Sequence, residues 1–124
     1  MDDWSRFNPA DAAALLDGIE GEVGKVATDW WNTNKAKVGG HLDRLARDGV
    51  EIRAQIATGQ LDQASAERYF RMERRSLQAL EAFTEFMTAV LAQKVADTVF
   101  TVIGWAIFNR TGINVAPDLV RPKA

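Results

Sequence analysis

Apolar residues recur at helical spacing along two long stretches of the chain. In the first stretch they are Leu16, Ile19, Val23, Val26 and Trp30, followed in a second register by Val38, Leu42, Leu45, Ile52 and Ile56. In the second stretch they are Tyr69, Met72, Leu80, Phe83, Met87, Leu91, Val102 and Trp105. Spacings of three and four residues are typical of one face of an α-helix, so both stretches are predicted to be helical.

Residues that start and stop helices stand at the ends of both stretches. Asn8 is a good N-cap, and Pro9 suits the first position of a helix because its missing N–H is not needed there. Gly59 can end the first helical stretch in the left-handed conformation, and Asp62 can cap the second. Thr111–Gly112 is predicted to end the second stretch.

These signals predict an all-α protein, a long antiparallel helical hairpin with helices over about residues 9–58 and 62–110. Gly39–Gly40 interrupts the first helix, since two adjacent glycines cost a helix interior roughly 2 kcal/mol relative to alanine. A bend or break there is favoured over a straight helix, and a break would allow a compact three- or four-helix bundle. The 124 residues suit one domain, flanked by tails at 1–8 and 111–124.

The position of the turn predicts which residues of the two arms face each other. Small residues of the first arm would face residues 96–102 of the second and let the backbones approach closely. These small residues are Gly18, Gly21 and Gly24. The same pairing places Lys25 near Asp97, and it places the adjacent Trp30 and Trp31 opposite Val90 and Leu91, with one tryptophan packing on a second surface.

Residues 98–108 contain no charged residue and are apolar on every side of a helix. A helix that is apolar all round is buried all round, and one hairpin partner does not cover it. We therefore expect a homo-oligomeric bundle, with a monomeric core and a membrane segment over residues 86–108 as alternatives. The membrane alternative is weakened by Gln93, Lys94 and Asp97, because charges near the centre of a spanning helix are costly.

Both tails carry large apolar residues at the same end of the hairpin, and they either dock on a neighbouring copy or fold back on their own chain. The residues expected to mediate self-association are Trp4, Phe7, Trp30, Trp31, Val99, Val102, Ile103, Trp105, Phe108, Ile113 and Val115.

Charge is unevenly distributed behind a net charge of -2. Residues 1–33 carry two basic and seven acidic side chains, and residues 34–80 carry nine basic and six acidic ones. The basic region is either a solvated helical face with interspersed acids or a patch for an anionic partner. The patch would consist of Arg44, Arg47, Arg68, Arg71, Arg74 and Arg75. The near-neutral total gives no reason to expect nucleic acid.

Catalytic chemistry has little support in the sequence. There is no Cys, His41 is the single histidine, and no phosphate-binding or nucleophile motif occurs. Glu81 and Glu85 are four residues apart, but no histidine completes a metal site, so we expect a solvated or ion-paired stripe. We expect neither enzymatic activity nor a cofactor, metal or small-molecule substrate.

The sequence therefore favours a structural or assembly subunit, of the kind found in virions, filaments or secretion machinery, that self-associates through its apolar helical end and tails. A membrane-associated helical protein and a binder of nucleic acid or an acidic partner are the alternatives. The acidic start Met1–Trp4 lacks the features of a secretory signal, so we expect a location in the cytoplasm or within an assembled particle.

Overall fold

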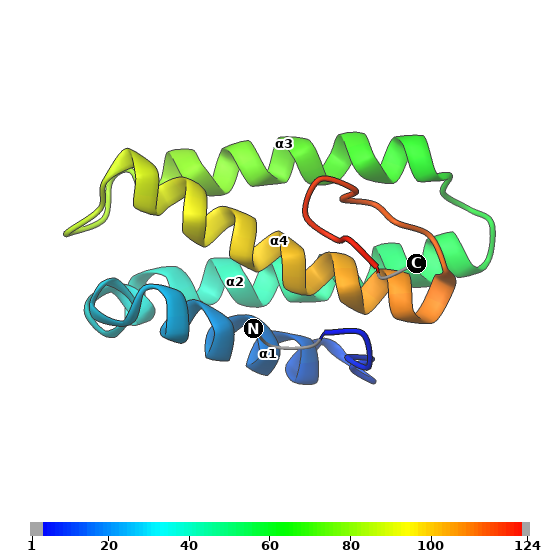
Figure 1. Cartoon of the computed structure of the whole chain (residues 1–124), viewed down its shortest axis with the longest axis horizontal. Coiled ribbons are helices and arrows are strands. Elements are labelled where there is room, and N and C mark those ends of the chain that lie inside the picture. The colour runs from blue at the N-terminus through cyan, green and yellow to red at the C-terminus, as the bar shows by residue number, and fades with distance from the viewer. Residues whose placement is uncertain (1–3, 123–124) are drawn as a thin grey trace.

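Four helices make up the fold of residues 4–122, which are the residues that the computed structural model describes. They are α1 (Ala12–Val26), α2 (Thr28–Ala57), α3 (Gln63–Glu81) and α4 (Ala89–Thr111). Helix α4 is central and packs against the other three, with α3 on one side and α1 and α2 on the other (Figure 1). The described chain contains no strand, so the predicted all-α class is confirmed.

The first predicted arm is two helices rather than one, and the break lies at Ala27. Its backbone leaves the helical region at φ -145° and ψ 55°, and α1 folds back against α2. The predicted break at Gly39–Gly40 is wrong, because α2 continues through both glycines. Val38 and Leu42, on either side of the pair, are buried in the core. Their burial offsets the weak helix propensity of the two glycines.

The second predicted arm is also divided, by a connection over residues 82–88 between α3 and α4. Thr88 caps α4, its hydroxyl accepting a hydrogen bond from the Leu91 N–H at 3.1 Å. The apolar spacing continues through this connection, so periodicity alone did not reveal the break. A continuous helix over 62–110 is therefore wrong, and the two breaks turn the predicted hairpin into a four-helix arrangement.

Several predicted helix ends are confirmed. The Asp62 carboxylate accepts a hydrogen bond from the Ser65 N–H at 2.7 Å. Gly59 and Gly112 follow α2 and α4 with φ of 77° and 75°, which is the left-handed region that glycine adopts without steric cost. The start of α1 differs from the prediction, because Asp11 is its N-cap and Pro9 lies outside the helix.

Ten of the 23 residues of α4 are buried, all between Ala92 and Ile107, and they are covered within one chain. Its fully buried residues include Val99, Val102 and Ile103. Helix α1 does pack against α4, but the predicted close approach of its glycines to that helix is wrong, because the space around Gly21 is open. A side chain added at Gly18 would meet Phe7, and one at Gly24 would meet Trp31.

The described parts of both tails fold back on the bundle at the C-terminal end of α4 (Figure 1). The Asn109 side-chain amide donates hydrogen bonds to the carbonyl oxygens of Trp4 and Phe7, both at 2.8 Å. In the C-terminal segment Val115 and Val120 are buried. Of the two alternatives for the tails, the structure therefore has the one in which they fold back on their own chain. Residues 1–3 and 123–124 lie outside the described part.

Candidate functional site

Four of the five large apolar side chains that are exposed in the described part of the chain gather around the connection between α3 and α4. Phe83 is 92% exposed, Phe86 76% and Val90 79%, and Leu80 is 41% exposed at the end of α3. We call these four residues the apolar tip. The connection projects from one end of the bundle, opposite the end where the tails fold back (Figure 1). The apolar tip is therefore a hydrophobic surface on an otherwise well-packed chain.

The connection is held to α2 by hydrogen bonds. The Trp30 Nε1–H donates to the Thr84 hydroxyl at 2.7 Å, and the Asn34 side-chain amide donates to the Glu85 carbonyl oxygen at 3.0 Å. The Thr84 hydroxyl in turn donates to the Glu81 carbonyl oxygen at 2.6 Å. Because the backbone is anchored in this way, the exposure of the neighbouring phenylalanines is part of a defined conformation.

Phe86 has a left-handed backbone with φ of 62°. A non-glycine residue in this region costs roughly 1–2 kcal/mol, and aromatic residues rarely adopt it. Strained residues of this kind cluster at functional sites. The strain and the exposure of Phe86 therefore coincide at one position of the apolar tip.

Glu81 is fully buried at the last turn of α3, directly before the connection. Neither of its carboxylate oxygens has a hydrogen-bond partner in the described part of the chain. Burial raises the pKa of Glu81 to about 8, because the charged form loses its hydration. The predicted solvated stripe of Glu81 and Glu85 is therefore wrong. Glu85 is exposed on the connection, whereas Glu81 belongs to the core.

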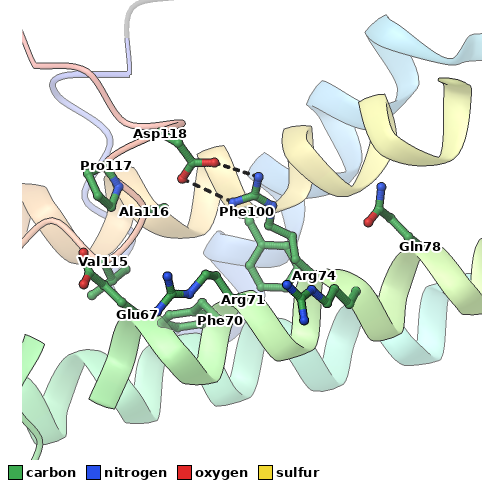
Figure 2. Close-up of a pocket in the computed structure, with 11 residues that line it drawn as sticks. Glu67, Phe70, Arg71, Arg74, Gln78, Phe100, Val115, Ala116, Pro117 and Asp118 are labelled. Carbon is green, nitrogen blue, oxygen red and sulfur yellow. Dashed lines mark hydrogen bonds and ion pairs between the residues drawn. The ribbon is translucent and has the colours of Figure 1, made fainter. Parts of the chain in front are cut away.

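A second feature is a cavity of about 590 Å³ between α3, α4 and the C-terminal segment. Phe70 and Phe100, both buried, meet edge to face with their ring centroids 5.9 Å apart and form its apolar side. Residues 115–118 form the opposite wall (Figure 2). Helix α3 contributes the polar part of the lining, one carboxylate, one amide and three arginines; these are Glu67, Gln78, Arg71, Arg74 and Arg75.

Arg74 fixes the C-terminal segment to this cavity. Its guanidinium binds both carboxylate oxygens of Asp118, at 2.8 and 3.3 Å (Figure 2). It also contacts Asp97 at 3.2 Å. The hydrogen bond with Asp118 raises the pKa of Arg74 and lowers that of Asp118. Asp97, which the sequence pairing placed near Lys25, thus has its ion pair with Arg74 of α3.

The residues predicted to mediate self-association are mostly covered by their own chain. Trp30, Val99, Val102, Ile103 and Val115 are at most 3% exposed. The others are partly buried; they are Trp4, Phe7, Trp31, Trp105, Phe108 and Ile113. Their sequence pattern indicated burial correctly, but it did not distinguish burial within one chain from burial between chains. The apolar tip was missed because Leu80 and Phe83 fit the helical period that predicts a core.

The six predicted patch arginines are divided among different contacts. Arg44 pairs with Asp48 and Glu73 at 3.4 and 3.5 Å, and Arg47 pairs with Asp43 at 3.0 Å. Arg68 donates to the Ser65 hydroxyl at 3.2 Å. The structure brings the remaining three together at the cavity; these are Arg71, Arg74 and Arg75.

No protein-family model matches this chain, and no curated protein or solved structure is significantly similar to it. Residues 4–122 contain no group of three His, Cys, Asp or Glu side chains that could hold a metal ion. Helix α4 is long and apolar enough to cross a membrane, and 56% of its most apolar 18-residue window is buried inside the bundle. The buried core helix of a soluble protein has the same length and composition.

Proposed function

We propose that this chain is a non-enzymatic helical subunit that self-associates through its apolar tip. The observation that carries the proposal is the exposure of Phe83 and Phe86, 92% and 76%, on a connection that hydrogen bonds fix to α2. Large apolar side chains held in water are unfavourable for an isolated chain, and burial of each against a partner is worth about 1.5–3 kcal/mol. Self-association covers them.

A second copy is favoured over a lipid surface by the charges around the apolar tip. Glu85 lies between Phe83 and Phe86 in the sequence and is exposed. A carboxylate on the inserting segment costs several kcal/mol in hydrocarbon. At the rim of a symmetric protein contact, Glu85 of one copy and Lys94 of the other supply opposite charges, because Lys94 is also exposed on the first turns of α4.

This proposal moves the self-association surface away from the tails and the apolar end of α4. Those segments are covered within the chain, so their packing already supports a stable subunit. The membrane alternative over residues 86–108 has less support, because unfolding of the bundle would be needed to expose Val95 to Ile107 of α4, most of which is buried.

Light scattering on the purified chain tests the proposal. The double substitution Phe83→Ser with Phe86→Ser removes the apolar tip, and Met72→Ser removes another exposed apolar side chain, 67% exposed on α3, as the matched control. We expect wild type and Met72→Ser to give masses above the 13.7 kDa of one chain that rise with concentration. The double variant should remain at one chain.

Three outcomes contradict the proposal. They are a wild-type mass that stays at one chain at every micromolar concentration, a double variant that assembles as wild type does, and a Met72→Ser variant that dissociates as the double variant does. Flotation with liposomes tests the membrane alternative. If wild type floats with the lipid and the double variant does not, the apolar tip binds a membrane instead of a second copy. Circular dichroism confirms that each variant retains its helices.

A further inference from the structure

We propose that the cavity between α3, α4 and the C-terminal segment binds a small amphipathic anion, an aromatic carboxylate or sulfonate. This site is separate from the apolar tip, and the inference does not depend on self-association. Its volume of about 590 Å³ lies within the range of about 300–1,000 Å³ that is typical of small-molecule sites.

Arg71 and Arg75 supply the positive charge of the cavity, and one carboxylate, Glu67, also belongs to its lining and leaves a net positive charge on these three residues. The described part of the chain contains no acidic side chain in an ion pair with either arginine. Arg74, between them in the sequence, is neutralised by Asp118 and Asp97. Residues three and four apart lie on the same face of a helix, where like charges repel each other. A bound anion relieves this repulsion.

The contact between Arg74 and Asp118 shows that the cavity wall accommodates a carboxylate. Two parallel contacts at 2.8 and 3.3 Å join the planar guanidinium to both carboxylate oxygens. Planar oxyanions such as carboxylates are matched by arginine in this forked geometry. Arg71 and Arg75 carry the same group on the same face of α3, so the chemistry suited to them is a second oxyanion beside Asp118.

The apolar part of the ligand is defined by the other side of the cavity. Phe70 and Phe100 lie at its base, almost covered at 3% and 1% exposed, and Val115, Ala116 and Pro117 lie across from them (Figure 2). A mostly apolar wall with a few charged groups at one side is typical of small-molecule sites. A flat apolar body carrying one negative group therefore fits both halves of the cavity.

The dye 8-anilinonaphthalene-1-sulfonate serves as the probe, because it combines an aromatic body with one sulfonate. N-phenyl-1-naphthylamine has the same aromatic body without the charge and is the ligand control. Fluorescence titrations compare wild type with Arg71→Gln plus Arg75→Gln. The matched control is Arg47→Gln plus Arg68→Gln, which removes the same charge from exposed arginines that do not line the cavity.

We expect the sulfonate to bind wild type and the control variant with the same affinity, and the cavity variant about tenfold more weakly or worse, since charged hydrogen bonds are lost. The neutral dye should bind wild type more weakly than the sulfonate. Backbone amide chemical shifts of the full chain should change at residues 70–75 and 115–118.

Equal affinity of the two arginine variants overturns the proposal, as does equal binding of the charged and neutral dyes. Chemical-shift changes confined to residues 80–90 would assign the dye to the apolar tip and also overturn it. Repeating the titration on Phe83→Ser plus Phe86→Ser distinguishes the cavity from the apolar tip. Sulfonate binding by this variant should equal that of wild type, whether or not the variant self-associates.

Discussion

The carboxyl group of Glu81 should make the stability of this protein depend strongly on pH. The side chain is fully buried, its oxygens have no partner among residues 4–122, and its pKa is about 8 instead of 4.5. In the unfolded chain it regains the ordinary pKa. Between these two values the unfolded state ionises and the folded state keeps its proton, so rising pH favours unfolding.

The size of the effect follows from the two pKa values. Below pH 4.5 both states are protonated and the folded state carries no penalty. Each pH unit between the two values then costs about 1.4 kcal/mol, which gives a loss of about 3 kcal/mol between about pH 5 and pH 7.5. Above a pH of about 8 the loss levels off, because both states are ionised. Domains of this size have stabilities of about 5–15 kcal/mol, so the change is large.

Urea denaturation of wild type, Glu81→Gln and Glu85→Gln at several pH values measures this loss. The amide of Glu81→Gln does not titrate, so the difference in unfolding free energy between wild type and this variant should change by about 3 kcal/mol across the interval. Glu85→Gln removes an exposed carboxylate four residues away and should follow wild type in parallel. A wild-type curve that runs parallel to that of Glu81→Gln would refute the reasoning.

Four further substitutions test individual features of the fold by urea denaturation or hydrogen exchange. Phe86→Gly should raise stability by about 0.5–1 kcal/mol, because glycine relieves the left-handed strain at φ 62°; a loss of stability would contradict this. Gly104→Ala should lower the stability by about 1–3 kcal/mol, because the added carbon would stand 2.6 Å from the Val120 side chain. Gly21→Ala is the matched control: it has open space around it and should raise the stability by up to about 1 kcal/mol. Equal effects of the two would contradict the packing of the C-terminal segment. Asp118→Asn removes the ion pair with Arg74 and should accelerate amide exchange over residues 113–120. The free energy of unfolding should fall by only about 0.5–1 kcal/mol, because the carboxylate is partly exposed. Unchanged exchange would show that the contact with Arg74 does not hold the C-terminal segment.

Helix content and the main helix ends could be predicted from the sequence, because they depend on local chemistry. Asp62 caps α3 through its own side chain, and Gly59 and Gly112 adopt the left-handed conformation that only glycine takes easily. The burial of Val102 and its neighbours could be predicted because residues 98–108 are apolar on every side of the helix.

The breaks at Ala27 and within residues 82–88 could not be predicted, because apolar spacing continues across both. They exist because folding each arm back covers α4 with three helices, and this tertiary gain outweighs local helix propensity. The prediction of a break at Gly39–Gly40 was wrong for the same reason, since the buried neighbours of the two glycines hold them in α2. The cavity depends on the C-terminal segment returning to α3, a contact between residues 44 positions apart.

Distances between spin labels test the central claim, that two copies meet at their apolar tips. The chain has no cysteine, so Glu85→Cys places a single label beside the apolar tip, and Gln60→Cys places one in the turn at the far end of α2. Helix α2 has 30 residues and is about 45 Å long, so labels at position 60 should be far apart in a dimer joined at the tips. We predict strong dipolar coupling between copies at position 85 and none at position 60; coupling at position 60, or its absence at position 85 in an assembled sample, would contradict the account.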